Sequence, residues 1–429
     1  MRSVIVIGAG IAGLTAAWRL ANEGRDVLLL EASERPGGTI QTHNRDGITF
    51  ERGPQSFRSG ANYSLRLIEN VGLRYAILPA QDSAKTPFIL WKNGLNAVPK
   101  ALTNRAFFPL TALLRAAAEP FLADDPPEGD ESVFDFFARR LGHHVASRIA
   151  DPLVAGIFGG DPRELSIQAA FPDLARAERN GRSLIGSALT ARWTQPARLP
   201  WAPKTLFSLR YGLEALPLRI AQLLGHRLRL SSPVEEIQHI NGGFRVIAPG
   251  GPYEAASVVV AAPPHQAAAF SPVGRDELAA FPRASMASVL IGWPSEEVPE
   301  PIDGFGWLAP STLRKDVLGV IAVSKCFPVH SPGITLLRVM IGGSRDPGHP
   351  RDPEELVLRA RQVVESVHSI RAAPSFSDVA IHGIPQYRLG HIERLRSLQA
   401  ALPGLRWLGW GYSGIGLEHG VRAAQDLVI

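Results

Sequence analysis

The chain has 429 residues, 45% of them hydrophobic, which predicts two or three globular domains with large apolar cores. The formal net charge is +5, and the cations are almost all arginine, because lysine occurs only at Lys85, Lys92, Lys100, Lys204, Lys315 and Lys325. We find no basic stripe interleaved with aromatic residues and no nucleic-acid motif, which argues against nucleic acid and favours anionic small molecules or an anionic membrane surface.

Cysteine usage, histidine spacing and hydropathy exclude several further classes. Cys326 is the only cysteine, so the chain holds no intrachain disulfide and no thiolate metal cluster. His143 and His144 lack the i, i+4 spacing of a metal pair, and no metal site is expected. The first motif begins at residue 4 and no long apolar run follows, so we expect neither a leader peptide nor a membrane span. These features predict a cytoplasmic protein, soluble or bound peripherally to a membrane.

The first motif combines a strand, a glycine turn, a helix, a second strand and an acid. The apolar run from Val4 to Ile7 enters Gly8-Ala9-Gly10-Ile11-Ala12-Gly13, and the run from Val27 to Leu30 ends in Glu31. Glycines at these positions permit the turn, the approach of a pyrophosphate to the backbone and close packing of helix on strand. The acid lies where it could accept hydrogen bonds from ribose hydroxyls. The motif therefore predicts a dinucleotide site, for NAD or for FAD.

Two further glycine turns follow, Arg35-Pro36-Gly37-Gly38-Thr39 and Glu51-Arg52-Gly53-Pro54-Gln55-Ser56. Turns clustered so closely suggest a long ligand lying across several loops, which favours FAD over NAD. Either turn alone would also be explained as a structural turn, because Gly and Pro are common turn residues.

The character of the chain changes between residues 85 and 201, where a short strand, Phe88 to Trp91, precedes a mostly helical insertion. The part from Ala97 to Leu122 mixes arginine and lysine with leucine and phenylalanine. Such a segment lies either in a membrane interface or against an ordinary core. Residues 124–130 form a polar loop, and Asp151 to Pro162, with three glycines, is also expected to be a loop.

After residue 202 we expect a return to the nucleotide domain. Short antiparallel strands are predicted at 228–230, 234–237 and 244–247, with Asn241-Gly242-Gly243 as a hairpin turn, and a buried strand at 257–262. Residues 285–383 predict a second inserted α/β segment, with strands at 287–291, 318–324 and 334–341 and a helix at 353–369. The chain closes with a strand at 405–408, a glycine turn and a last helix after Gly416.

With these pieces in place, the sequence resembles the FAD-dependent amine-oxidase superfamily over nearly its whole length. The turns at Gly8 to Gly13 and at Arg35 to Gly38, together with Glu31, are shared by all members. Later segments are similar to the porphyrinogen-oxidising branch, namely Phe50 to Phe57, Asp151 to Ser166, Gly304 to Leu308 and Gly409 to Leu417.

The resemblance implies a discontinuous Rossmann-like FAD-binding domain made of residues 1–84, 202–284 and 384–429. It implies a helical membrane-binding domain at 85–201 and a substrate domain at 285–383. Non-covalent FAD would be held by Gly8, Ala9, Gly10, Gly13, Glu31, Arg35, Gly38, Gly53, Pro54, Val234, Trp407, Gly409, Gly414, Ile415 and Gly416. The substrate cavity would be lined by Gly156, Phe158, Gly159, Phe305, Gly306 and Leu308.

The chain departs from the branch at Pro87, where many relatives place an arginine that pairs with a substrate propionate. Lys85 lies nearby and could take that role. After the paired glycines, wider superfamily members have arginine. This chain has Thr39 there, and porphyrinogen-oxidising relatives often have threonine at this position too.

The function implied is oxidation of protoporphyrinogen IX to protoporphyrin IX in haem biosynthesis, with FAD as cofactor and dioxygen as acceptor, releasing hydrogen peroxide. The flavin carries the chemistry, so no residue is assigned a catalytic role. Coproporphyrinogen III is the nearest competing substrate. Two more distant functions are compatible with the same fold, namely a flavin amine oxidase or carotene desaturase, and a flavin-binding scaffold without turnover. The sequence is compatible with a homodimer and does not determine the oligomeric state.

Overall fold

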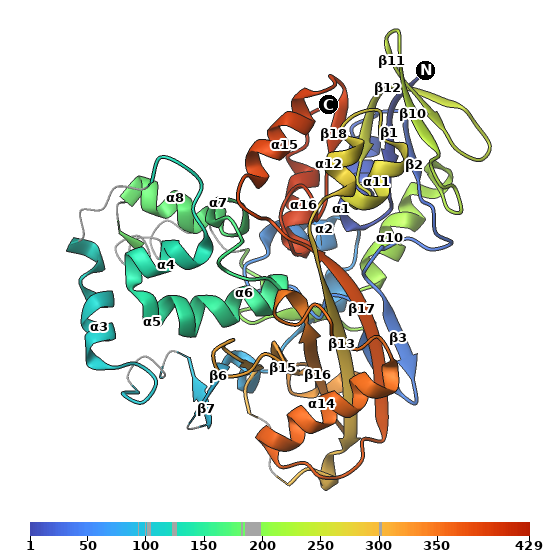
Figure 1. The fold of residues 1–429 in the computed structure, drawn as a ribbon. Coiled ribbons are helices and arrows are strands. Elements are labelled where there is room, and N and C mark those ends of the chain that lie inside the picture. The colour runs from blue at the N-terminus through green and yellow to red at the C-terminus, as the bar shows by residue number, and fades with distance from the viewer. Residues whose placement is uncertain are drawn as a thin grey trace. The chain divides into compact units, whose positions relative to one another are not determined.

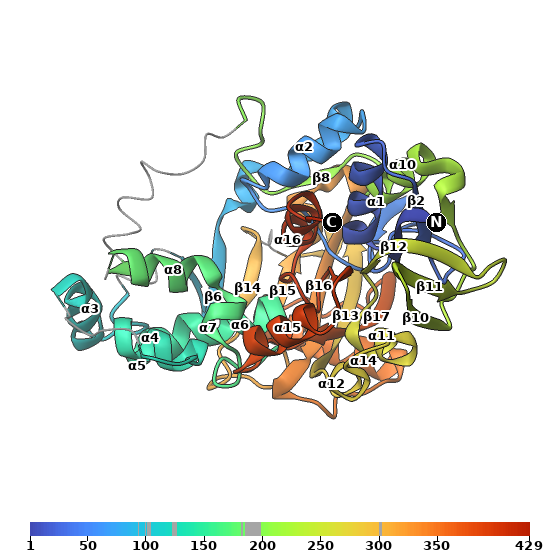
Figure 2. The ribbon, with the colours of Figure 1, turned by 90° about the horizontal axis from the view of Figure 1, so that it is seen from above.

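The computed structural model describes residues 1–92, 94–98, 100, 104–121, 127–181, 183–184, 199–299 and 303–429. The chain forms two compact units, each assembled from separated stretches (Figure 1 and Figure 2). Unit 1 comprises Met1–Pro79, Leu199–Phe281 and Ile392–Ile429, and unit 2 comprises Ala80–Arg198 and Pro282–His391. The expected mixed α/β fold is confirmed, whereas the assignment of three domains to cofactor, membrane and substrate stays a prediction.

Unit 1 is built on a seven-stranded sheet with a parallel centre. β1 (Arg2–Ile7) lies between β2 (Val27–Leu30) and β12 (Tyr253–Val260), and both neighbours run parallel to it. β9 (Leu228–Arg229) extends the sheet beyond β2, and β18 (Leu405–Trp407) pairs in parallel with the end of β12. Strands that are buried on both faces need continuous apolar runs, which explains why β1 and β2 have them.

An antiparallel hairpin, β10 (Glu236–Ile240) and β11 (Gly243–Ile247), pairs with the other end of β12. The hairpin expected around Asn241-Gly242 is therefore confirmed. Two small sheets complete the strands of unit 1: β3 (Thr42–Arg45) with β4 (Ile48–Glu51), and β5 (Ile77–Pro79) with β8 (Phe207–Leu209).

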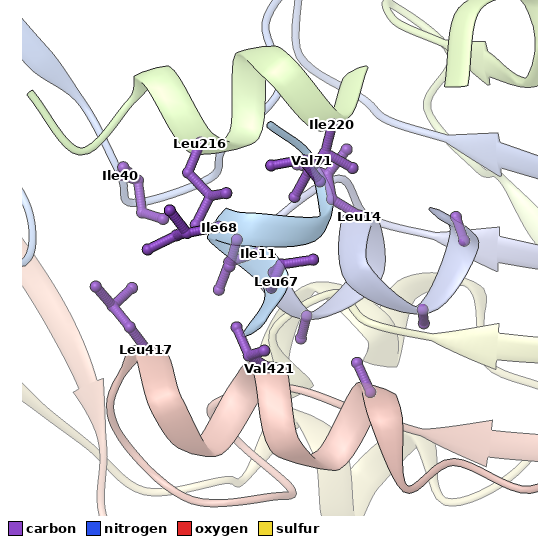
Figure 3. Packing of buried hydrophobic residues seen from close by; sticks show 14 of the residues in the cluster. Ile11, Leu14, Ile40, Leu67, Ile68, Val71, Leu216, Ile220, Leu417 and Val421 are labelled. Carbon is purple, nitrogen blue, oxygen red and sulfur yellow. The ribbon is translucent and has the colours of Figure 1, made fainter. Parts of the chain in front are cut away.

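The side chains of β1 alternate between two apolar clusters. Val4 and Val6 face the first cluster, and Ile5 and Ile7 face the second. Figure 3 shows the first cluster, in which four helices interlock through residues such as Leu14. These helices are α1 (Ile11–Asn22), α2 (Asn62–Asn70), α10 (Ala215–Leu224) and α16 (Leu417–Gln425). The second cluster contains side chains of α11 (Pro264–Phe270), α12 (Arg275–Ala279) and α15 (His391–Ala400).

Unit 2 is built on a second seven-stranded sheet. All its neighbouring strands are antiparallel except β6 and β14, which are parallel. The strand order is β17 (Phe376–Pro385), β13 (Arg283–Pro294), β16 (Ile334–Gly342), β15 (Gly319–Ala322), β14 (Gly306–Leu308), β6 (Pro87–Trp91) and β7 (Gly94–Ala97).

One face of this sheet is covered by α14 (Pro353–His368), which Figure 1 shows running across β13 and β17. Its buried residues, including Val363, pack with Val289 and Leu337 in one apolar cluster. The helix starts at a conventional cap, because Asp352 accepts a hydrogen bond from the N–H of Glu355.

The part of unit 2 between residues 104 and 184 is mostly helical and contains a buried ionic centre. The guanidinium of Arg140 is fully buried and bonds the equally buried carboxylate of Glu119, which also accepts from the Ser183 hydroxyl (2.7 Å) and the Leu184 N–H (2.7 Å). The elements are α3 (Leu110–Ala117), η4 (Glu119–Phe121), α4 (Val133–Leu141), α5 (His143–Val145), η5 (Ala146–Ala150), α6 (Asp151–Phe158), α7 (Ile167–Ala170) and α8 (Pro172–Gly181).

Two predictions of local structure are wrong. The segment Asp151–Phe158 is the helix α6 and not a loop, with Pro152 in its first turn and Gly159 as a left-handed cap at φ +58°. The strand at Leu228–Arg229 pairs in parallel with β2 and not within an antiparallel set, because a tertiary partner decides the pairing. Residues 99, 101–103, 122 and 124–126, which belong to the predicted membrane segment and polar loop, lie outside the described residues.

Candidate functional site

The first glycine turn of unit 1 ends in a helix whose N-terminus has no side-chain cap. α1 begins at Ile11 with Gly10 as its N-cap residue, and no side chain bonds the N–H groups of the first turn. Gly8 takes φ +101° and donates its N–H to the carbonyl of Leu30 (2.8 Å). A helix start of this kind attracts an anion through its unpaired N–H groups and the helix dipole.

The three glycines of this turn meet different surroundings. A Cβ at Gly13 would lie 2.0 Å from the carbonyl oxygen of Gly8, and one at Gly8 would lie 3.0 Å from the backbone of Ala261. A Cβ at Gly10, in contrast, would meet nothing within 4 Å. Two of the glycines are thus required by the protein itself, and the third leaves its space open for a pyrophosphate.

The second turn lies directly against the first. The N–H of Gly37 bonds the carbonyl of Ala9 (2.8 Å), and a Cβ at Gly38 would lie 3.3 Å from the Cα of Gly10. Arg35 holds this turn in place, because its guanidinium bonds the Gly38 carbonyl (2.5 Å) and the Glu214 carboxylate (3.2 Å). The structure thus gives Arg35 a role within the protein, and its expected contact to FAD stays a prediction.

Glu31 closes the same site. One carboxylate oxygen accepts from the N–H of Ala9 (2.6 Å), and the other accepts from the N–H (2.9 Å) and hydroxyl (2.8 Å) of Ser33. The segment that leads from β9 to Val234 also lies here, since Ser232 donates its N–H to the carbonyl of Glu31 (2.8 Å). Glu31 is therefore fixed in orientation, and its predicted bond to ribose stays a prediction.

The third turn is stacked on the second. A Cβ at Gly53 would lie 1.8 Å from the carbonyl oxygen of Thr39, so only glycine fits. Pro54 follows, and the side-chain oxygen of Gln55 is buried and has no hydrogen-bond partner among the residues that the structure describes. A buried acceptor without a donor is costly, which makes Gln55 a candidate ligand that was not among the predicted site residues.

The closing segment brings further backbone to this region. Gly409 takes φ +105° and lies close to the first turn, because its Cβ would be 3.7 Å from the oxygen of Ala261 and 3.9 Å from the Cβ of Ala12. Gly414 and Gly416 also have positive φ, and Gly416 forms the uncapped start of α16.

Ile415 is half-buried between Gly414 and Gly416. Trp407 is different, because its indole is buried in the second apolar cluster and donates to the carbonyl of Leu398 (3.2 Å). Its carbonyl accepts from the side chain of Gln399 (3.3 Å), and its expected contact to FAD stays a prediction.

The structure of unit 1 thus fits a dinucleotide cofactor. It has an uncapped helix start, an open position at Gly10 and an unpartnered acceptor at Gln55, and it brings the predicted glycines of four chain segments together.

In unit 2, α6 lies against β14, as the two predicted halves of a substrate site require. A Cβ at Gly156 would lie 2.6 Å from the Leu308 side chain, so the glycine allows the close approach. The carbonyl of Gly159 accepts from the N–H of Ser344 (2.7 Å). Phe158 is part of the core, because its buried ring contacts Phe171 at 5.6 Å between centroids.

The N-terminus of α6 is anchored by an ion pair that the sequence did not reveal. Arg345 and Asp151 lie 3.0 Å apart, with side chains only 5% and 7% exposed. Asp151 also accepts from the N–H of Ser311 (2.7 Å), and Arg345 bonds the carbonyl of Ala309 (2.5 Å), just beyond β14. Burial lowers the pKa of the Arg345 guanidinium, and the Asp151 carboxylate opposes that shift. The pair ties α6 to the strand it covers.

β14 is anchored on its other face through Trp307. Its indole N–H bonds the ring nitrogen Nε2 of His368, the last residue of α14, at 2.9 Å. Because an indole N–H only donates, the imidazole must accept and be neutral. Burial lowers the pKa of His368 to about 4, so the neutral form holds at neutral pH.

Phe305, Gly306 and Lys85 meet at the start of β14. Phe305 donates its N–H to the carbonyl of Thr86 (2.9 Å), and Gly306 pairs with Pro87, so Lys85 lies near this strand end as expected. Its ammonium pairs with Asp82 at 2.8 Å.

Comparisons with known proteins identify the family of the chain. The family of flavin-containing amine oxidoreductases matches residues 11–427. A protoporphyrinogen oxidase of Nicotiana tabacum chloroplasts is 33% identical, over 99% of this chain and 84% of that one. A coproporphyrinogen III oxidase of Bacillus subtilis is 28% identical, over 99% and 97% of the two chains.

Among solved structures, a provisionally named protoporphyrinogen oxidase from Exiguobacterium sp. 255-15 superimposes with a TM-score of 0.82. It is 26% identical, and the match covers 99% of this chain and 97% of that one. The chain is therefore an FAD-dependent member of the flavin-containing amine oxidoreductase family.

Proposed function

We propose that this protein oxidises protoporphyrinogen IX to protoporphyrin IX in haem biosynthesis, with dioxygen as acceptor. The observation that carries the proposal is the 33% identity to the tobacco protoporphyrinogen oxidase over 99% of this chain. The reaction removes six hydrogen atoms from the macrocycle, so three dioxygen molecules are reduced to three hydrogen peroxide molecules.

In this proposal the two units have separate tasks. Bound FAD supplies the redox chemistry, which is hydride acceptance and reoxidation by dioxygen. The turns at Gly10, Gly38 and Gly53 hold the cofactor through backbone groups. Leu308 and the backbone at Gly156 offer apolar contact to the macrocycle.

Coproporphyrinogen III is the second candidate substrate. The match to the B. subtilis coproporphyrinogen III oxidase, which covers nearly all of both chains, favours it. The two substrates differ in carboxylate number, because protoporphyrinogen IX carries two propionates and coproporphyrinogen III carries four. The cations of the binding surface therefore decide between them.

Anaerobic reduction of the bound flavin tests the proposal. The purified FAD-loaded protein is mixed without oxygen with each porphyrinogen in turn, and the absorbance of oxidised flavin is followed. We expect protoporphyrinogen IX to bleach the flavin and air to restore it, with porphyrin fluorescence appearing. Bleaching by coproporphyrinogen III alone would select the second candidate. Bleaching by a polyamine alone would indicate an amine oxidase. If neither porphyrinogen nor the polyamine bleached the flavin, the result would favour a flavin-binding scaffold without turnover.

We also propose that the protein contacts a membrane surface through α3. Leu110 and Leu114, one turn apart on this helix, are 52% and 61% exposed, and Phe121 beyond it is 88% exposed. Apolar side chains on one helix face, with arginine nearby, suit an interfacial position. Among the described residues, no helix has the length and apolar character needed to cross a bilayer.

A further inference from the structure

Two of the six lysines of the chain lie at one end of the unit 2 sheet, on either side of Phe305. Phe305 donates its N–H to the carbonyl of Thr86 (2.9 Å), the residue after Lys85. Its own carbonyl accepts from the N–H of Ala322 (2.9 Å), three residues before Lys325. Lysines that are 240 positions apart in the sequence thus flank one residue of the proposed substrate surface.

The short elements that carry the two lysines are in contact. Lys85 ends η2 (Asp82–Lys85) and Lys325 lies in α13 (Val323–Cys326). The N–H of Gln81 bonds the carbonyl of Cys326 (3.1 Å) and joins the two elements. The two lysines therefore lie on neighbouring elements of unit 2.

Each lysine is paired with an aspartate that is largely in solvent. The distances are 2.8 Å for Lys85 to Asp82 and 3.5 Å for Lys325 to Asp303, and the aspartate side chains are 85% and 80% exposed. Such surface pairs contribute about 1 kcal/mol or less, so a carboxylate ligand that binds the lysine can replace the aspartate.

We propose that Lys325 binds a carboxylate of the substrate beside Lys85, so that the two ammonium groups receive two propionates of one porphyrinogen. The inference rests on the proposed function. Pro87, the first residue of β6, pairs with Gly306 and supplies no cation at the position where many relatives have arginine. The two lysines would supply the missing positive charge. Two lysines from opposite sides of Phe305 take the place of one side chain on the strand.

The proposal predicts opposite effects for the two members of the Lys325 pair. Lys325→Gln removes a ligand for the propionate and weakens binding. Asp303→Asn removes the competing carboxylate and strengthens binding. A pair that served only to stabilise the fold would respond to both substitutions in the same direction, with a loss of stability and no gain in affinity.

Binding of protoporphyrin IX to the FAD-loaded protein, followed by tryptophan fluorescence, separates these cases without turnover. We expect about ten-fold weaker binding for Lys325→Gln, tighter binding for Asp303→Asn and recovery in Lys325→Arg. The dimethyl ester of the porphyrin, which lacks the charges, should not distinguish Lys325→Gln from wild type. Lys315→Gln is the matched control, because it removes the same charge from the exposed loop at the other end of the β14–β15 hairpin.

Equal affinity of wild type, Lys325→Gln and Lys315→Gln for the free acid would overturn the inference. The proposed function would remain intact if porphyrinogen still bleached the flavin of the wild-type protein. A wild type that retains FAD but neither oxidises nor binds any porphyrin compound would overturn both. Should Lys325→Gln lose its flavin, Asp303→Asn decides alone: tighter binding supports the role of Lys325, and unchanged binding contradicts it.

Discussion

Burial of His368, whose ring accepts a hydrogen bond from Trp307, should make stability depend on pH. The neutral imidazole accepts the indole N–H in the folded state, and burial lowers the pKa of His368 to about 4. In the unfolded chain the pKa is about 6.5. Between these values the unfolded chain binds a proton that the folded protein does not, so stability falls as the pH drops from about 6.5 to about 4.

The size of the effect follows from the shift. A difference of about 2.5 pKa units corresponds to about 3.4 kcal/mol at 1.36 kcal/mol per unit, which is the upper limit because His368 is partly open to water. His368→Gln removes the titration and keeps an acceptor for Trp307. We therefore expect the free energy of unfolding of wild type to fall more steeply than that of His368→Gln between pH 7 and pH 5.

Urea unfolding of the FAD-loaded protein, followed by tryptophan fluorescence at pH 7, 6 and 5, measures the difference. His226→Gln, which removes an exposed histidine of unit 1, should behave like wild type. Equal pH slopes for wild type and His368→Gln would refute the reasoning, since the bond would then place no constraint on the protonation of His368.

Three further substitutions test the other sites. Gly10→Ala should leave the stability of the FAD-free protein unchanged and weaken FAD binding about ten-fold or more, measured by flavin fluorescence, because the added Cβ meets only the cofactor. Asp151→Asn should lower the free energy of unfolding by about 3 kcal/mol in urea titrations, because the buried Arg345 would lose its direct ion-pair partner. Leu114→Ser should reduce binding to anionic vesicles in flotation assays about ten-fold, whereas Leu358→Ser, at an equally exposed position of α14, should not.

The first glycine turn could be predicted because its causes are local. The spacing of Gly8, Gly10 and Gly13 between a strand and a helix already specifies a tight turn, and each glycine meets the surroundings that the motif implies. The turns at Gly38 and Gly53 were placed on the same cofactor by sequence proximity. In the structure the Gly38 turn lies against the first turn and the Gly53 turn lies against the Gly38 turn, and their shared contact to the cofactor stays a prediction.

The helix α6 could not be predicted in the same way. Gly156, Gly159 and Gly160 disfavour a helix by propensity, so the segment had the composition of a loop. Gly156 is explained only by Leu308, some 150 positions later, whose side chain fills the space that a Cβ would take. The anchor from Asp151 to Arg345 joins residues that are even farther apart in sequence, and no local pattern marks it.

If the two lysines anchor the substrate as proposed, the position of the cations matters for substrate choice as well as their number. Protoporphyrinogen IX carries its two propionates on adjacent pyrroles, so two neighbouring ammonium groups can receive both from one edge of the macrocycle. The four propionates of coproporphyrinogen III lie on all four pyrroles, and a pair of lysines at one strand end reaches only one side. If Lys85 and Lys325 are the anchors, removing either should raise the KM for protoporphyrinogen IX more than that for coproporphyrinogen III. The reverse order would mean that other cations of the chain decide the substrate.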